Sequence, residues 1–227
     1  MVTVVIPWRP QPSRERAYDA TTRWYRDNLP EARLLPVDSG DAVFNLAQCR
    51  NLGVELADDD DVVVIGDADT LPELEPLLAA IDGARESGRV HLPYTRYHWL
   101  GASGTAQFAT GAPLSTCDHE LVMGACSGVY VAAPDTWRNH GGQDERFRGW
   151  GFEDAAWYLA HETILGAPPV RHEGRVYALH HTAEQREGPQ YDANAALMER
   201  YRAAATDADA MRQLVFSAAN ARTAPGF

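Results

Sequence analysis

The sequence lacks the features that mark secreted or membrane-spanning proteins. Its 227 residues include only three cysteines, at 49, 117 and 126, and their spacing matches no metal-binding or redox motif. We therefore expect free thiols in a reducing compartment. No apolar run approaches the roughly 18 residues needed to cross a bilayer, and the N-terminal segment has no basic region of the kind that opens a signal peptide. We predict a cytoplasmic protein without a membrane span.

Positive charge is also scarce. The chain has 20 Lys and Arg against 32 Asp and Glu, a net charge of −12 at pH 7. Such a surface repels a nucleic-acid backbone or an anionic membrane, so neither is expected as the main partner. A small anionic ligand is still compatible with this charge, because a bound divalent cation can reverse the local field of a site.

Strands and helices alternate in the first third of the chain. Strands are predicted at 2–6, 34–37 and 62–65, and helices at 13–28 and 45–56. Ser13 is expected to cap the first helix. This alternation predicts an α/β fold with a mostly parallel central sheet flanked by helices. Such sheets bind ligands outside the carboxyl ends of their strands.

The rest of the chain continues without a repeat or a low-complexity linker. The further expected elements are a helix at 72–84, strands at 89–93, 124–133 and within 170–179, a helix at 154–165 and helical structure from 190 onward. Residues 94–117 show no clear period and are expected to form a long loop or irregular hairpin, which is usually functional or mobile. We predict a single domain over 1–227.

Two carboxylates directly follow the strand predicted at 62–65. Asp67 and Asp69 are two residues apart, so in an extended segment their side chains point the same way. Mg²⁺ and Mn²⁺ favour carboxylates together with substrate phosphates. A solvated turn is the alternative interpretation of this triplet, but its place after a buried strand favours a metal site. The aspartates at 58–61 precede the strand and are expected to be a solvated charge run.

A glycine-rich turn with two carboxylates is the second motif. Residues 147–154 read FRGWGFED. The glycines around Trp150 permit a tight turn with exposed backbone, and Glu153 and Asp154 stand at the start of a helix, whose dipole favours their ionised form. The alternative is that Asp154 caps the helix and Glu153 lies in solvent. A cap would not require the Gly-Trp-Gly sequence, so we interpret the turn as functional.

These two motifs in this order resemble the GT-A glycosyltransferases. The DAD triplet at 67–69, followed about 80 residues later by GWGFED at 149–154, is similar to the pattern of β-1,4-galactosyltransferases and polypeptide N-acetylgalactosaminyltransferases. Their motif reads Gly-Trp-Gly-Gly-Glu and then Asp or Asn, so Phe152 replaces a glycine. The resemblance covers most of residues 2–182. It implies a GT-A fold with a nucleotide-sugar-binding half at about 1–123, an acceptor and catalytic half at about 124–189 and a helical tail at 190–227.

The resemblance also implies a donor site. It places the nucleotide base and ribose near Arg9 and Asp38, and the Arg50–Asn51 helix segment near the donor, although pairing of Arg50 and Asn51 with surface acids is an equal alternative. Small residues at 124–128 would lie beneath the donor sugar or form a tightly packed central strand. The residues expected to contact the donor are Pro7, Arg9, Asp38, Arg50, Asn51, Asp67, Ala68, Asp69, Gly128, Trp150 and Gly151.

Two adjacent histidines offer a further metal ligand. In this superfamily a histidine after a late strand often completes the metal shell, and neutral imidazole suits Mn²⁺. Neighbouring strand residues point to opposite faces, so one of His180 and His181 is expected to coordinate. We favour His181, which matches the His of a Leu-x-His segment, with His180 as the alternative. Asp69 is expected to bind the metal directly and Asp67 to face the ribose or a metal-bound water.

The activity implied by the resemblance is a sugar transfer. The donor would be a nucleoside-diphosphate sugar, expected to be a UDP-sugar, with Mn²⁺ or Mg²⁺, and the acceptor a hydroxyl of a glycan, protein or small molecule. Asp154 would be the general base and Glu153 would bind hydroxyls, which implies inversion, whereas the polypeptide-modifying relatives retain configuration. A nucleotidyltransferase is one alternative, although residues 7–10 lack the usual glycine-rich phosphate loop. A non-catalytic nucleotide-sugar or carbohydrate-binding protein is the other.

Overall fold

The computed structural model describes residues 1–149, 151–181 and 187–222, and only the backbone of 218–222. Six strands form the central sheet in the order β2-β1-β3-β8-β5-β9. They are β1 (Val2–Pro7), β2 (Arg33–Val37), β3 (Val62–Gly66), β5 (His91–Leu92), β8 (Val129–Ala132) and β9 (Val170–Arg171). Strand β1 runs parallel to β2 and β3, and β5 runs parallel to β9, whereas β8 is antiparallel to both of its neighbours. The α/β prediction is confirmed, with a mixed sheet that contains one reversed strand.

A second, four-stranded sheet brings distant parts of the chain together. Its order is β4-β10-β6-β7, formed by β4 (Thr70–Pro72), β10 (Arg175–Ala178), β6 (Arg96–Trp99) and β7 (Glu120–Val122). In the β4–β10 pair, Thr70 lies opposite Ala178, and the amide of Leu179 donates to the carbonyl of Asp69 at 2.8 Å. This pairing carries the segment after β10 to the turn after β3.

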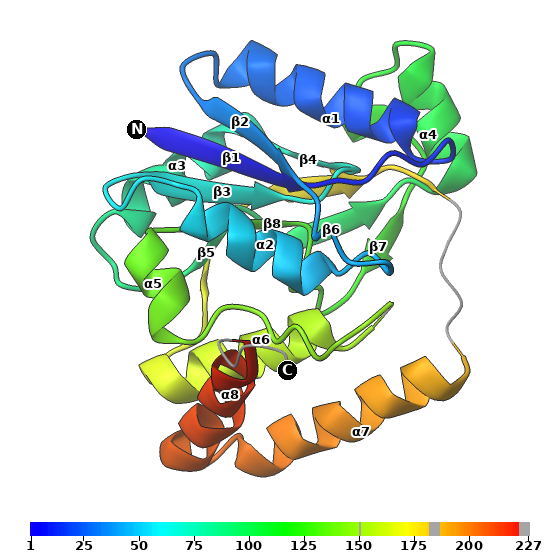
Figure 1. Ribbon diagram of the computed structural model, residues 1–227. Helices are drawn as coiled ribbons and strands as arrows, with labels where there is room; N and C mark the ends of the chain where they lie inside the picture. The colour runs from blue at the N-terminus through cyan, green and yellow to red at the C-terminus, as the bar shows by residue number, and fades with distance from the viewer. Residues whose placement is uncertain (150, 182–186, 223–227) are drawn as a thin grey trace.

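Helices cover the central sheet and form a separate layer beside it (Figure 1). They are α1 (Glu15–Asn28), α2 (Leu46–Glu55), α3 (Leu74–Ala84), α4 (Gly101–Ala109), α5 (Pro134–Asn139), α6 (Glu153–Leu165), α7 (Pro189–Ala204) and α8 (Ala208–Arg222), with a 3₁₀ turn at Leu114–Thr116. In the view of Figure 1, α1 lies above the sheet and α2 below it, and α6, α7 and α8 make up the lowest layer. No helix in the described part of the chain is both long and apolar enough to span a bilayer.

The core follows from the β-branched strands. Val4 to Ile6 of β1 and Val62 to Ile65 of β3 are at most 1% exposed, as expected for strands covered on both faces. Helix α2 approaches β1 closely because Gly53 has no side chain: a Cβ there would lie 2.1 Å from a methyl group of Val5. A second apolar cluster joins α6, α7 and α8. The helical tail expected from residue 190 is therefore confirmed as two packed helices.

Several local expectations were wrong. Helix α1 begins at Glu15, and its cap position is Arg14 without a side-chain hydrogen bond, so Ser13 does not cap it. Residues 94–117 form β6, α4 and the 3₁₀ turn, so the expected loop is wrong, whereas the antiparallel pairing of β6 with β7 agrees with the alternative of an irregular hairpin. Tertiary packing explains the glycine within α4, because a Cβ at Gly104 would fall 2.0 Å from the carbonyl oxygen of Asp118. The segment 170–179 contains two strands, and α3 starts at Leu74 because Thr70–Pro72 pairs with β10. All three cysteines are free, as expected.

Two fully buried histidines lie between α5 and α6. His161 accepts a hydrogen bond at Nε2 from the amide of Val90 (3.0 Å), and its Nδ1 is 3.1 Å from the carbonyl of Ala167. Both ring nitrogens are thus satisfied in the neutral form. Burial lowers the pKa of His161 to about 3 and that of His140 to about 4. His161 therefore belongs to the core.

These histidines make the stability depend on pH with a definite sign. The folded pKa of His161, about 3, lies below its unfolded value of about 6.5, so the unfolded chain binds the proton first. The contribution of His161 to the free energy of unfolding is therefore complete above about pH 6.5 and is lost as the pH falls toward 3. We expect His161→Gln to lessen the loss of unfolding free energy by about 1.4 kcal/mol per pH unit in this window. Urea denaturation at pH 7, 6 and 5 measures it, with the exposed His119→Gln as control. Equal slopes for wild type and His161→Gln would contradict the assignment.

Candidate functional site

The turn after β3 is held by the approach to β8. The amide of Asp67 donates to the carbonyl of Gly128 at 2.8 Å, and the hydroxyl of Thr70 donates to the same carbonyl at 2.8 Å. Gly128 has φ +91°, and a Cβ there would lie 3.1 Å from the ring of Tyr97. Both its conformation and the close packing therefore require glycine. The residue between the two carboxylates, Ala68, is partly buried and packs against the main core.

Arg50 joins the two acidic motifs. Its side chain is 0% exposed, and its guanidinium donates to Oδ1 of Asp67 at 2.6 Å and to Oδ1 of Asp154 at 2.8 Å. It also donates to Oε1 of Gln143 at 2.7 Å and lies 5.0 Å from the ring centroid of Tyr130. Arg50 thus pairs with the carboxylates of the site and not with surface acids. The pairing brings the turn after β3 and the start of α6 into one cluster, although 87 residues separate the two aspartates.

Asp154 is fixed from three directions. Its Oδ1 accepts hydrogen bonds from Arg50, from the hydroxyl of Tyr130 and from Nε2 of Gln143, the last at 3.2 Å. It stands in the first turn of α6, and the cap position of that helix is Phe152. The carboxylate therefore does not serve as the helix cap. A network of this kind sets the orientation of a carboxylate more tightly than a single ion pair does.

Burial and neighbouring charges shift the pKa values of the groups in this cluster. Burial raises the pKa of Asp67 to about 6, although the Arg50 cation beside it acts in the opposite direction. Burial, reinforced by the charge of Asp154, raises the pKa of Glu153 to about 7. Burial alone would lower the pKa of Arg50, but its two aspartates, Asp67 first, hold that pKa well above its usual value. The site therefore holds a permanent cation and carboxyl groups that gain protons near neutral pH.

The four candidate metal ligands do not share one set of contacts. Nε2 of His181 is 2.9 Å from Oδ2 of Asp69, and the two side chains are 23% and 19% exposed. The ring of His180 instead lies toward Trp99, at 6.1 Å between centroids. Asp67 faces Arg50. In residues 1–149, 151–181 and 187–222, no three His, Cys, Asp or Glu side chains converge as a metal site. The structure thus brings together Asp69 and His181 alone of the expected ligands.

The residues expected to hold the base and ribose bind each other. Nη2 of Arg9 is 2.5 Å from Oδ1 of Asp38, and Arg9 Nε lies 2.8 Å from its Oδ2. The Arg9 guanidinium is the main cause that lowers the pKa of Asp38 to about 2. Pro7, next to these residues, is a buried member of β1 opposite Val37. The pair lies at the carboxyl ends of β1 and β2, the edge at which such sheets bind ligands.

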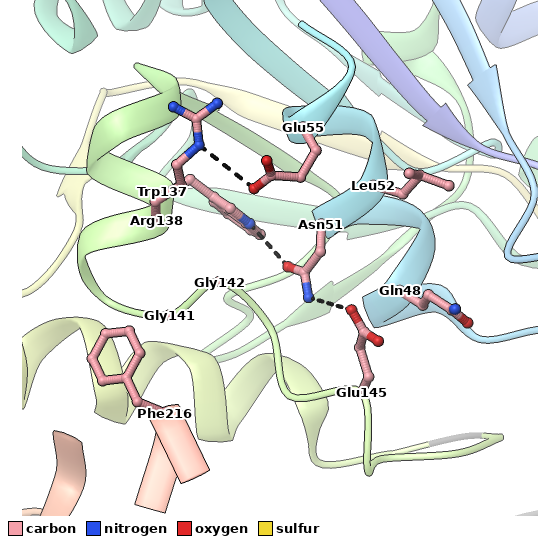
Figure 2. Close-up of a pocket in the computed structure, with 10 residues that line it drawn as sticks. All are labelled: Gln48, Asn51, Leu52, Glu55, Trp137, Arg138, Gly141, Gly142, Glu145 and Phe216. Atoms are coloured by element: carbon pink, nitrogen blue, oxygen red, sulfur yellow. Dashed lines mark hydrogen bonds and ion pairs between the residues drawn. The ribbon is translucent and has the colours of Figure 1, made fainter. Parts of the chain in front are cut away.

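Asn51 is committed to protein contacts. Its Oδ1 accepts from Nε1 of Trp137 (3.0 Å) and from the amide of Gln143 (2.9 Å), and its Nδ2 donates to the carbonyl of Gln143 at 2.7 Å and to Glu145 at 2.9 Å. Figure 2 shows it on the wall of a pocket of about 350 Å³ between α2, the Gly141–Gly142 turn and Phe216 of α8. None of the site carboxylates lines this pocket. Asn51 therefore supports Gln143, which in turn supports Arg50.

Tyr130 and Gln143 are site residues that the sequence did not reveal. Tyr130 lies in a strand that was expected, and its hydroxyl reaches Asp154 because the strand runs beside β3. Gln143 lies in the segment between α5 and α6, where no motif marks it. Only the alternation of strand β8 could have shown which of its side chains face the site.

The glycine-rich turn has a left-handed backbone. Gly149 and Gly151 have φ of +65° and +105°, and Phe152, at φ +76°, is the only non-glycine residue with positive φ in the described chain. The ring of Phe152 packs on Tyr191 of α7, with 5.2 Å between ring centroids. Position 152 thus demands the conformation that glycine adopts most easily, which explains a glycine in the resembling families. Trp150 lies outside the described residues.

The left-handed backbone at Phe152 should affect the free energy of unfolding of variants at this position. Alanine normally stabilises a chain relative to glycine, but at positive φ the order reverses. We expect Phe152→Gly to be more stable than Phe152→Ala by about 1 kcal/mol, since the two variants lose the same aromatic contact and differ only in backbone strain. Chemical denaturation of the two variants measures the difference. If the alanine variant is the more stable, the left-handed backbone at Phe152 is wrong.

Comparisons with known proteins agree with this architecture. No family model and no curated protein sequence matches the chain. Among solved structures, it is similar to the catalytic domain of Drosophila β1,4-galactosyltransferase 7 in complex with xylobiose, with a TM-score of 0.57 and 16% identity over 86% of this chain and 79% of that one. It is also similar to GalNAc-T7 with UDP, GalNAc and Mn²⁺, with a TM-score of 0.51 and 11% identity over 96% of this chain and 55% of that one. The chain therefore has the GT-A glycosyltransferase fold that its motifs predicted.

Proposed function

We propose that this protein is a metal-dependent glycosyltransferase that moves a sugar from a nucleoside-diphosphate sugar to an acceptor hydroxyl. The observation that carries the proposal is the buried Arg50, which binds Asp67 of the acidic turn and Asp154 of the glycine-rich turn. In a GT-A fold, carboxylates at a strand end such as Asp67 are expected beside the donor. Arg50 bonds Asp67 and also Asp154, a fixed carboxylate that could serve the acceptor. A protein that only binds nucleotide sugars would not need Asp154 held on three sides.

The donor end of the site fits a hard divalent cation. Asp69 offers carboxylate oxygen and His181 imidazole nitrogen, both partly exposed and in contact, and Mn²⁺ accepts this combination while leaving positions for diphosphate oxygens and water. When bound, the cation would neutralise the charge that develops on the departing diphosphate. The Mn²⁺ and UDP in the GalNAc-T7 structure support Mn²⁺ and a UDP-sugar as the first ligands to test. Asp67, held by Arg50, would face the ribose or a metal-bound water.

Asp154 would act at the acceptor end as the general base. Arg50, Tyr130 and Gln143 fix its orientation. As the acceptor oxygen bonds to the anomeric carbon, its proton would pass to Asp154 and the carbon–oxygen bond to the diphosphate would break, with inversion. Glu153, with a pKa of about 7, would hydrogen-bond to hydroxyls of donor or acceptor in either protonation state.

Replacing the proposed base should separate chemistry from binding. Asp154→Asn keeps an Oδ1 that can accept the three hydrogen bonds but cannot take a proton at neutral pH. We expect kcat to fall by about 10²-fold or more, while the thermal shift produced by UDP with Mn²⁺ stays unchanged. Asp82→Asn, the same change on an exposed face of α3, should leave both values as in wild type. Turnover within threefold of wild type in Asp154→Asn would exclude this residue as the base.

The two histidines should differ in their effect on the metal. We expect His181→Ala to raise the Mn²⁺ concentration for half-maximal donor turnover by about 10-fold or more, since it removes a direct ligand. His180→Ala, the neighbouring control, should change it less than twofold, because its ring lies toward Trp99. A Mn²⁺ titration of EDTA-treated protein gives both values. The reverse ranking would transfer the ligand role to His180, and activity in EDTA would overturn metal dependence.

A further inference from the structure

Helix α7 binds the backbone of the glycine-rich turn through one buried side chain. Asn194 is 1% exposed. Its Oδ1 accepts from the amide of Arg148 at 3.2 Å, and its Nδ2 donates to the carbonyl of Arg148 at 2.8 Å and to the carbonyl of Gly151 at 3.4 Å. The side-chain amide thus pairs with the turn much as a neighbouring strand would.

The described residues of the turn lie outside the regular helices and strands. Gly149, Gly151 and Phe152 all have a left-handed backbone, which continues neither a helix nor a strand. A buried carbonyl without a partner costs about 1–3 kcal/mol. The bonds from Asn194 satisfy the carbonyls of Arg148 and Gly151 at the two ends of the turn. Two and three residues beyond Gly151 stand Glu153 and Asp154.

Helix α7 holds the same segment at two further points. The hydroxyl of Tyr201 donates to Oδ2 of Asp144 at 2.8 Å, and Tyr191 packs on the ring of Phe152. On the other side, Asn45 of the α2 cap donates to the carbonyl of Glu145 at 3.0 Å. The described residues between 144 and 152 are therefore held between α2 and α7. The C-terminal helices contribute to the geometry of the site without contributing an acid or a base.

We propose that Asn194 is a positioning residue, which fixes the glycine-rich turn so that Glu153 and Asp154 meet the acceptor in the reactive geometry. The catalytic part of this inference rests on the proposed glycosyltransferase function. The donor end of the site has a separate support, since Asp69 is held by the β4–β10 pairing. Loss of the Asn194 contacts should therefore disturb the acceptor end more than the donor end. A displacement of about 1 Å at a reacting group costs about 10²-fold in rate.

The test compares two variants. One loses the hydrogen bonds between α7 and the glycine-rich turn, and the other loses a hydrogen bond at the C-terminal end of α7. Asn194→Leu has a similar volume but cannot bind the turn. Thr163→Val removes the bond from the Thr163 hydroxyl to the carbonyl of Ala205 (3.0 Å), which joins α6 to the end of α7 without touching the turn. Amide hydrogen exchange over residues 148–152 is measured first, because it does not depend on activity. The kcat and KM for donor and acceptor are then measured well below both melting temperatures.

We expect Asn194→Leu to speed exchange at 148–152 by at least tenfold and to lower kcat by about 10- to 100-fold, with the KM for the donor changed less than threefold. Thr163→Val should match wild type in all three. Unchanged exchange at 148–152 in Asn194→Leu, or equal losses of kcat in the two variants, would overturn the positioning role. If wild type transfers no sugar from any donor, the proposed function and the catalytic role of Asn194 both fail, and the exchange result alone decides whether Asn194 holds the turn.

Discussion

A single buried guanidinium constrains the rest of the site. Arg50 is inaccessible to water, and a cation in that position requires anionic partners within hydrogen-bond distance. Asp67 and Asp154 supply them, one from the turn after β3 and one from the first turn of α6. Removing one partner of a buried pair typically costs about 3–5 kcal/mol, since it leaves an uncompensated charge. That is a large share of the 5–15 kcal/mol that stabilises an ordinary domain. The two acidic motifs therefore cannot separate without weakening the fold itself.

This constraint divides the labour of the proposed site. In the proposed function, Asp67 stays with Arg50, and Asp69 and His181 would bind the cation and the diphosphate. Asp154 is held by Arg50 together with Tyr130 and Gln143 and would serve the acceptor. Two further residues support these groups. Asn51 of α2 binds Gln143, and Asn194 of α7 binds the glycine-rich turn. The reactive groups rest on rigid elements, which is what preorganised electrostatic catalysis requires.

Sequence reasoning recovered the parts of this arrangement that have a local signal. The run at 62–65 and the glycines around Trp150 predict a strand and a turn, and both acidic motifs are evident in the sequence, although their contact is not. The bridging role of Arg50 and the parts played by Tyr130, Gln143 and Asn194 arise from packing between distant segments, for which one sequence has no period or spacing to read. The helix at 101–109 was missed for the same reason, since Gly104 is unfavourable in an isolated helix and only the close approach of Asp118 explains it. The sequence placed Arg9 and Asp38 correctly at strand ends, but not their pairing with each other.

In the proposed function, a divalent cation and a nucleoside diphosphate occupy one shared site beside Asp69 and His181. If they share it, each must raise the affinity of the other by the same factor. Isothermal titration of UDP into the protein with and without saturating Mn²⁺ measures that factor most directly. We expect Mn²⁺ to tighten UDP binding by at least about tenfold, and UDP to tighten Mn²⁺ binding equally. UDP affinity that is the same in Mn²⁺ and in EDTA, or absent in both, would contradict it.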